Sequence, residues 1–146
     1  MKKFQKMLLL IVASFMMITG VNADETLQSK IDAGEKTIVL DKNYNEEITI
    51  KKGQEVILDL NGYTLTGNIH DYGTLTIRSS KDGGQVVKGT KKQASIYVGD
   101  SGNNIAGKLT LESGKIINAD TGNAVYGIAC FAGSTVIING GGGVLF

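Results

Sequence analysis

The second half of the chain repeats one set of three short strand-like segments in a fixed order. The first recurs at 74–79, 108–113 and 135–140, the second at 85–88, 115–118 and 143–146, and the third at 95–98 and 127–130. The segments alternate inward apolar and outward residues, as half-buried strands do, and no helical pattern separates them. A strand triplet that recurs in this way is typical of a β-solenoid, in which each lap stacks in parallel on the one before.

We therefore expect an all-β parallel β-helix with three short strands per coil. Aligning the repeats places six apolar residues inward, in continuous internal files: Leu75, Ile77, Leu109, Leu111, Val136 and Ile138. The earlier runs at 38–40, 48–50, 56–60 and 63–66 give shorter laps, with Leu58 and Leu60 preceding Leu75 and Ile77 by 17 residues. On the outward face, Arg78 is expected one rung from Glu112, in a pair that solvent screens.

An antiparallel sandwich or barrel is the alternative, because it too contains many short strands joined by turns. Asn61-Gly62 and Asp82-Gly83 have the composition of two-residue hairpin turns. Hairpins do not require three aligned repeats, however, so the periodicity favours the solenoid.

The two ends of such a stack need cover, because apolar files and strand edges otherwise meet water. Residues 24–35 predict a short N-terminal capping helix, with Asp24 as its cap, Leu27 and Ile31 on one face, and Gly34 at its end. The coils occupy residues 36–146 and stop two strands into a cycle. We expect further coils in a longer chain, with end-to-end self-association as the alternative.

Residues 1–23 have the organisation of a secretion signal. Three lysines precede an apolar run at 7–18, and small residues follow at 21–23. A membrane anchor is the alternative, but the run is shorter than the roughly 20 residues that a spanning helix needs. The sequence therefore predicts a secreted or cell-surface protein with no membrane span after signal removal.

Charge and cysteine content exclude several partners. The chain carries 15 Lys plus Arg against 14 Asp plus Glu, and loss of the three signal lysines leaves 12 against 14. A weakly acidic chain without a basic stripe predicts no nucleic-acid partner. A single cysteine excludes an intramolecular disulfide framework and a multi-cysteine zinc site. Cys130 aligns with Val98, which predicts a buried, inert thiol; an intermolecular disulfide and a nucleophile are the alternatives.

Three segments of the first half resemble the start of secreted right-handed parallel β-helix proteins of the pectate-lyase-like superfamily. They are TIVLD at 37–41, EITIK at 47–51 and VILDLNGYTLTG at 56–67. The later GxLTI and SGxIIN repeats are similar to rung and turn motifs of that superfamily. The resemblance implies right-handed coils, and many bacterial members are surface or adhesin-like proteins.

Lyases and hydrolases of that superfamily carry clustered aspartates on adjacent coils, the lyases with a basic residue as well, and this chain matches no such motif. Six aspartates are expected in turns or on solvated rungs: Asp41, Asp59, Asp71, Asp82, Asp100 and Asp120. His70 precedes Asp71, but adjacent strand residues point to opposite faces, so the pair does not suggest a base with its orienting carboxylate. We expect His70 in a loop. No catalytic, cofactor-binding or metal-binding residue is predicted.

Residues 140–143 are four glycines that match no phosphate-binding motif and are expected to form a flexible turn. The threonine pairs 64/66 and 74/76 are too few for an ice-binding ladder and reflect β-propensity. Tyr97 lies between inward Ile96 and Val98 and is expected to face solvent. Four tyrosines are candidates for stacking on sugar rings: Tyr63, Tyr72, Tyr97 and Tyr126.

These patterns predict a non-enzymatic, secreted or cell-surface module that binds a glycan or a surface protein in the manner of an adhesin, without a cofactor. The alternative is the N-terminal part of a polysaccharide lyase or glycoside hydrolase whose catalytic coils lie beyond residue 146. A structural spacer within a larger surface protein is a third reading.

Overall fold

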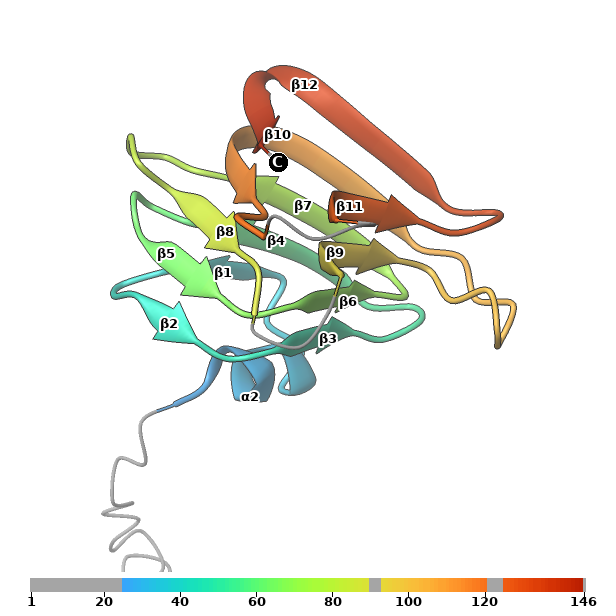
Figure 1. The fold of residues 1–146 in the computed structure, drawn as a ribbon. Coiled ribbons are helices and arrows are strands. Elements are labelled where there is room, and N and C mark those ends of the chain that lie inside the picture. Colours follow the sequence, from blue (N-terminus) through green and yellow to red (C-terminus); the bar gives the residue numbers. More distant parts are fainter. Residues whose placement is uncertain (1–24, 90–92, 121–124, 146) are drawn as a thin grey trace, which may run out of the picture.

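The computed structural model describes residues 25–89, 93–120 and 125–145. The described chain is all-β, with one short helix, and its strands pair in parallel in strongly curled sheets (Figure 1). The expected signal segment at 1–23 lies outside the described residues. No helix among the described residues is long and apolar enough to cross a membrane.

The chain runs repeatedly through three rows of strands. The first row holds β1 (Thr37–Val39), β4 (Glu55–Asp59), β7 (Thr74–Arg78) and the N-terminal halves of β10 (Lys108–Ile117) and β12 (Thr135–Leu145). The second holds β2 (Tyr44–Asn45), β5 (Thr64–Thr66), β8 (Gln85–Val87) and the C-terminal halves of β10 and β12. The third holds β3 (Ile48–Ile50), β6 (Ile69–Asp71), β9 (Ala94–Val98) and β11 (Tyr126–Cys130).

Strands β10 and β12 differ from the expected three short strands per lap, because each runs without a break from the first row into the second. They thereby join these two rows into one eight-stranded sheet, while the third row forms a separate four-stranded sheet. The glycines at 140–143 lie inside β12, so the expected flexible turn there is wrong. The backbones of Gly141, Gly142 and Gly143 pair in register with β10, and this pairing needs no side chain.

The predicted alignment of the last repeats is confirmed. Leu109 pairs in register with Leu75 on one side and with Val136 on the other. In the earlier laps the predicted register is wrong by two residues, since Leu75 lies beside Val56 and not beside Leu58. A slip of two residues keeps every inward position inward, so the alternation of apolar residues does not detect it.

The antiparallel alternative is wrong for the described residues. Every pair of named strands is parallel, and the one antiparallel contact is an isolated bridge between Asp100 and Ile105. Asn61-Gly62 connects the first row to the second and does not close a hairpin. Both residues have positive φ, 47° and 85°, which suits this sharp corner.

The core is a set of aliphatic columns between the two sheets. Leu75, Ile77, Leu109 and Leu111 are fully buried, as predicted. The columns open at the last lap, where Val136 is half-buried and Ile138 is 50% exposed. These two residues have the predicted inward register, but in the described part of the chain β12 pairs only with β10.

Helix α2 (Leu27–Asp32) covers the opposite end of the core (Figure 1). Leu27 and Ile31 are buried, as the helical spacing predicts. The N-cap is Thr26, whose Oγ1 accepts a hydrogen bond from the Ser29 N–H at 3.0 Å, and the expected cap, Asp24, lies outside the described residues. The chain leaves the helix through Gly34, at φ 85°.

The side chain of Gln28 replaces a neighbouring strand at the edge of β3. Its Oε1 accepts a hydrogen bond from the Thr49 N–H at 2.7 Å, and its Nε2 donates to the Thr49 carbonyl at 3.2 Å. The helix therefore satisfies edge backbone groups as well as covering apolar side chains.

Candidate functional site

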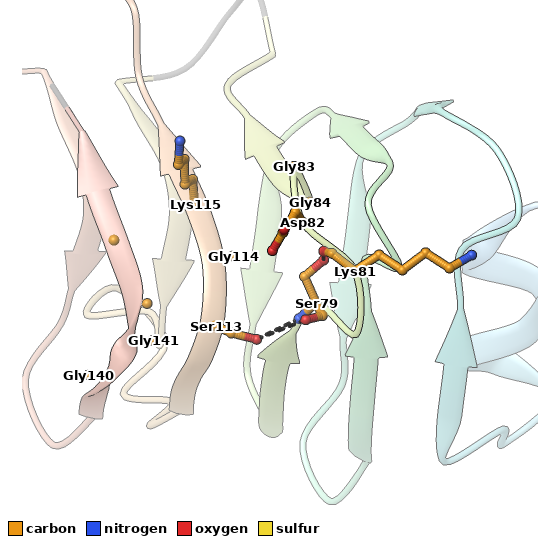
Figure 2. Close-up of a pocket in the computed structure, with 12 residues that line it drawn as sticks. Ser79, Lys81, Asp82, Gly83, Gly84, Ser113, Gly114, Lys115, Gly140 and Gly141 are labelled. Atoms are coloured by element: carbon orange, nitrogen blue, oxygen red, sulfur yellow. Dashed lines mark hydrogen bonds between the residues drawn. The ribbon is translucent and has the colours of Figure 1, made fainter.

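A pocket of about 340 Å³ lies at the corner where the first row of strands turns into the second (Figure 2). The loop between β7 and β8 contributes one wall, and the bends of β10 and β12 contribute the rest. Glycine, serine, lysine and one aspartate line it: Ser79, Lys81, Asp82, Gly83, Gly84, Ser113, Gly114, Lys115 and the glycines at 140–143. We call it the corner pocket.

Glycines are required where the wall loop closes on the corner. A Cβ on Gly84 would collide with the Ser79 side chain and lie 2.8 Å from Leu60 Cβ. A Cβ on Gly142 would lie 2.6 Å from Leu111 Cγ. Gly114, at φ 88°, pairs in register with Gly142, just after the register shift at which β12 has one more residue than β10. Backbone amides and carbonyls therefore form much of the pocket lining.

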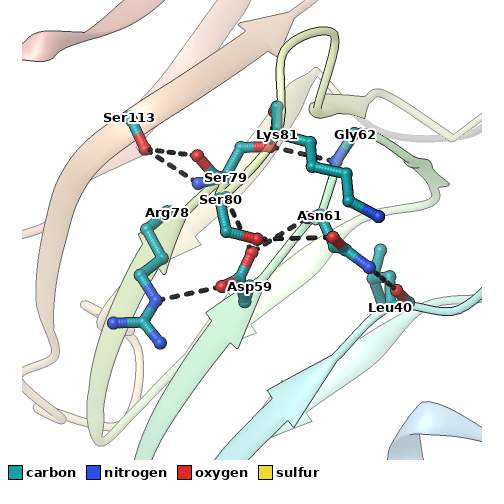
Figure 3. Close-up of polar contacts among 9 residues, drawn as sticks. All are labelled: Leu40, Asp59, Asn61, Gly62, Arg78, Ser79, Ser80, Lys81 and Ser113. Atoms are coloured by element: carbon teal, nitrogen blue, oxygen red, sulfur yellow. Dashed lines mark hydrogen bonds and ion pairs between the residues drawn. The ribbon is translucent and has the colours of Figure 1, made fainter.

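Two serines fasten the wall loop to the bend of β10 (Figure 3). Ser113 Oγ accepts a hydrogen bond from the Ser79 N–H at 2.8 Å and donates to the Ser79 carbonyl at 3.3 Å. Ser79 Oγ in turn accepts from the Gly62 N–H at 3.1 Å. The repeat alignment placed Ser79 and Ser113 at equivalent positions, but nothing in it indicated that the following glycines border a pocket.

Asp59 anchors the same corner from β4 (Figure 3). The residue is buried, and its carboxylate accepts hydrogen bonds from the Asn61 and Ser80 N–H groups at 2.9 Å each and from Arg78 Nε at 3.2 Å. Burial alone would raise the pKa of Asp59, but the two amide hydrogen bonds, together with the Arg78 charge, hold it below its usual value. Asp59 is the last residue of β4 and is buried, so the expectation of a turn or solvated residue is wrong.

The expected pairing of Arg78 with Glu112 is wrong. Arg78 is in register with Asp59 on the preceding lap and makes its ion pair there, while Glu112 is exposed. The buried Asp59 has lost most of its water, so it gains more from the guanidinium than the solvated Glu112 would.

Exposed charged groups border the corner pocket. Lys81, Asp82 and Lys115 are all exposed, and the two lysine side chains extend in different directions (Figure 2). The pocket therefore offers hydroxyl, ammonium and carboxylate groups around a backbone surface. Its lining includes one carboxylate only.

A second group of polar and aromatic side chains lies on the outward face of the four-stranded sheet. The His70 ring stacks on Tyr97 at 5.1 Å between centroids, and Tyr97 stacks on Phe131 at 6.4 Å. His70 Nε2 lies 3.1 Å from Glu47 Oε1, and its Nδ1 lies 3.4 Å from the Tyr72 hydroxyl. The expectation that His70 is a loop residue is wrong, because it lies in β6.

Tyr97 points outward, as expected, but it is only half-exposed and its two ring faces are turned to His70 and Phe131. Its hydroxyl accepts a hydrogen bond from the Ala94 N–H at 2.9 Å. The ring therefore presents an edge, not a face, to an incoming sugar. Tyr63 and Tyr72 are also half-buried, and Tyr126 is 47% exposed.

Asp71 lies beside His70 in sequence but on the inward face, between Ile50 and Val98 in its row. It is fully buried, so the expectation of a turn or solvated residue is wrong. Oδ1 accepts a hydrogen bond from the Gly73 N–H at 3.1 Å, and Oδ2 has no partner among the described atoms. Burial raises the pKa of Asp71 to about 7, against the opposing effect of the Gly73 hydrogen bond.

The remaining aspartates are dispersed and have local partners. Asp41 accepts from the Tyr44 hydroxyl, Asp100 binds Asn103, and Asp120 pairs with Lys88, while Asp82 borders the corner pocket. Within the described ranges, no group of three or more His, Cys, Asp or Glu side chains could hold a metal ion.

Cys130 has the predicted register opposite Val98 but not the predicted burial. Its thiol is exposed, because β11 pairs only with β9 in the described part of the chain and the inward column is open there. The alignment identified the correct column for Cys130, but the thiol is exposed because β11 belongs to the last lap of the described chain.

No family model, curated protein or solved structure matches this chain.

Proposed function

We propose that the protein is an exported, right-handed parallel β-helix module of the secreted or cell-surface type, and that it binds a glycan without cleaving it. Parallel strand rows that repeat along the chain support this fold, as do the rung and turn motifs that resemble the pectate-lyase-like superfamily. Within this reading, the corner pocket is the ligand site.

The observation that carries the proposal is the polarity of the corner pocket lining. Its side chains are hydroxyl, ammonium and carboxylate groups, and its glycines expose backbone donors and acceptors. A sugar ring carries many hydroxyl groups, each of which loses free energy if it leaves water without a new hydrogen bond. A volume of about 340 Å³ is at the lower end of the range for small-ligand pockets, which suits one or two sugar units.

The same lining supports binding over hydrolysis. Glycosidases of the usual type use two carboxyl groups on either side of the scissile bond, about 5–9.5 Å apart. Asp82 is the only carboxylate among the residues that line the corner pocket. We therefore propose that this pocket binds a glycan, and we assign no general acid or general base among its residues.

Glycan binding is tested by screening the purified protein against an immobilised glycan library and measuring hits by calorimetry. Asp82→Asn and Lys115→Ala should weaken binding at least about tenfold, the effect of one lost charged hydrogen bond. Lys52→Ala, an exposed lysine outside the pocket, is the matched control and should bind like the wild type.

Two results would contradict the proposal. Equal binding by the wild type, Asp82→Asn and Lys115→Ala would show that the ligand binds outside the corner pocket. Absence of any glycan ligand would favour a spacer or a protein-binding module. Release of shortened or unsaturated sugars from a bound polysaccharide would favour the enzymatic alternative.

A further inference from the structure

A second hollow, of about 420 Å³, lies where the second row of strands turns into the third. Its lining includes two glycines and five polar side chains, those of Asn45, Glu46, Glu47, Thr66 and Asn68. We call it the acidic groove. Asn45 and Thr66 are in register on the outward face of the second row, so the acidic groove opens on that face.

Strand β8 (Gln85–Val87) connects the acidic groove to the corner pocket. Gly84, directly before β8, lines the corner pocket, and Gly89, two residues after β8, lines the acidic groove. Gly89 is five residues after Gly84, which corresponds to at most roughly 16 Å of extended chain. Because β8 lies between β5 and β10, this face of the sheet has strands on both sides (Figure 1).

Outward side chains of the second row form the floor between the two hollows. Gln85 Nε2 donates a hydrogen bond to Thr64 Oγ1 at 3.2 Å, and this contact fixes both side chains. Val87 is in register with Thr66 on one side and with Ile117 on the other, and all three are half-buried. The floor therefore offers polar atoms beside apolar ones, which suits the hydroxyl groups and the CH faces of sugar rings.

The acidic groove presents hydrogen-bond acceptors. Asn68 is only 3% exposed, and its Nδ2 donates to the Ala94 carbonyl at 2.5 Å. Its Oδ1 lies 2.8 Å from the position that a Cβ on Gly89 would take, and it accepts no hydrogen bond within the described part of the chain. Glu47 Oε1 lies 3.1 Å from His70 Nε2, and the Glu47 side chain remains 52% exposed. A ligand here must supply donors.

The two hollows differ in charge. The described lining of the acidic groove includes two carboxylates and no cationic side chain, whereas that of the corner pocket includes two lysines and one carboxylate. The Glu46 carboxylate accepts hydrogen bonds from the N–H groups of Leu27 and Gln28, at 2.8 and 3.4 Å, which fix its position. The acidic groove therefore repels an acidic sugar, and hydroxyl donors of an uncharged sugar complement it.

We propose that the glycan is an extended chain that lies along β8, with one end in the corner pocket and an uncharged sugar in the acidic groove. This inference rests on the proposed function and deepens it. The corner pocket alone accommodates one or two sugar units, whereas occupation of both hollows requires an oligosaccharide. The acidic groove is then a second subsite that rejects uronic acids.

The dependence of affinity on chain length tests the second subsite. The probe is a size series, from the disaccharide to the hexasaccharide, of the glycan with the highest affinity in the library screen. Affinity measured by calorimetry should rise at least about tenfold from the disaccharide to the longer members, because one molecule then forms hydrogen bonds in both hollows.

Glu47→Lys separates the two hollows, because it removes an acceptor from the acidic groove only. It should return the longer oligosaccharides to the affinity of the disaccharide and leave the disaccharide unaffected. Glu55→Lys makes the same charge change at an exposed residue of β4 outside both hollows, so this matched control should bind like the wild type. Lys115→Ala should weaken binding of every member of the series.

Failure of this inference is distinguishable from failure of the proposed function. Binding that is sensitive to Lys115→Ala but independent of chain length would overturn the second subsite and leave the proposed function standing. Equal effects of Glu47→Lys and Glu55→Lys would also overturn the second subsite. Absence of any glycan ligand in the screen would overturn both proposals.

Uronic acids test the charge of the acidic groove. Two isomers of the shortest oligosaccharide with full affinity are prepared, each with one terminal sugar oxidised to a uronic acid. The isomer whose carboxylate enters the acidic groove should bind at least about tenfold more weakly than the parent, and Glu47→Lys should remove this difference. The other isomer, with its carboxylate beside Lys81 and Lys115, should bind no more weakly than the parent. Equal affinity of the two isomers would overturn the proposed charge selectivity.

Discussion

Arg78 Nε donates a hydrogen bond to Asp59 Oδ2 at 3.2 Å across the neighbouring strands β7 and β4. The pair is asymmetric, because the Asp59 side chain is 5% exposed and the Arg78 side chain 42%. The buried member thus depends on the exposed one, and on two backbone amides, to remain ionised.

Asp59→Ala should lower the free energy of unfolding by about 2–3 kcal/mol at pH 7, because it leaves the Asn61 and Ser80 N–H groups without an acceptor. Urea unfolding measures this loss. Since the pKa of Asp59 is lowered on folding, its charge stabilises the fold above the unfolded pKa, and this contribution disappears as the pH falls through the folded pKa.

The control for Asp59 is Asp82→Ala, which removes an exposed carboxylate and should change the free energy of unfolding by no more than about 0.5 kcal/mol. If Asp59→Ala were equally mild, the corner would not depend on this carboxylate.

Asp71→Asn should stabilise the protein at alkaline pH. The pKa of Asp71 is raised to about 7, so folding favours the protonated form, and the wild type loses stability as the pH rises from about 4 to about 7. A shift of this size corresponds to about 4 kcal/mol at most. Asparagine keeps the acceptor for the Gly73 N–H and carries no charge, so this loss should be absent from the variant.

Denaturant unfolding of wild type and Asp71→Asn at pH 4 and pH 8 measures the effect. The two proteins should differ little at pH 4, and the variant should be more stable at pH 8. A variant less stable than the wild type at pH 8 would show that the ionised carboxylate has a partner in the fold.

Gln28→Met should expose the edge of β3. The substitution keeps the length of the side chain and removes both hydrogen bonds to Thr49, which should cost about 1–2 kcal/mol. Hydrogen exchange at the Thr49 amide should accelerate more than exchange at Ile57, an interior strand residue. Gln28→Glu, which retains an acceptor for the Thr49 N–H, should give the smaller effect; equal protection at Thr49 in wild type and Gln28→Met would contradict the role of Gln28.

Gly107→Ala should destabilise the protein and Gly140→Ala should not, although both add one methyl group. A Cβ on Gly107 would overlap the Asp71 carbonyl oxygen, whereas a Cβ on Gly140 meets nothing within 4 Å. The first change should therefore lower the free energy of unfolding by more than about 2 kcal/mol, and the second should be nearly neutral. Thermal unfolding distinguishes them, and similar midpoints would show that the loop beside Asp71 can relax.

The first-row strands of the late laps were predictable because their sequences are similar, although the laps differ in length. Leu75, Leu109 and Val136 occupy equivalent positions in three similar segments, so one alignment gives their register. The pairing of Val56 with Leu75 was missed because an apolar alternation looks identical after a slip of two residues.

Other features depend on tertiary context that a single sequence does not carry. Strands β2 and β6 have only two and three residues, with polar side chains among them, and they form because neighbouring laps supply hydrogen-bond partners. Asp71 gave no sign of burial, since carboxylates rarely occupy core columns. The corner pocket arises from loop length and glycine placement, neither of which is a recognisable motif.

In the third row, the number of residues per lap varies while the core residues stay in register. Ile48 lies 21 residues before its partner Ile69, Ile69 lies 27 before Ile96, and Ile96 lies 32 before Ile128, yet all four occupy one column. The additional residues are accommodated between strands, including the segment that walls the corner pocket. Residues inserted there change the wall of the corner pocket while the aliphatic columns keep their register, so the surface at this corner can vary independently of the interior.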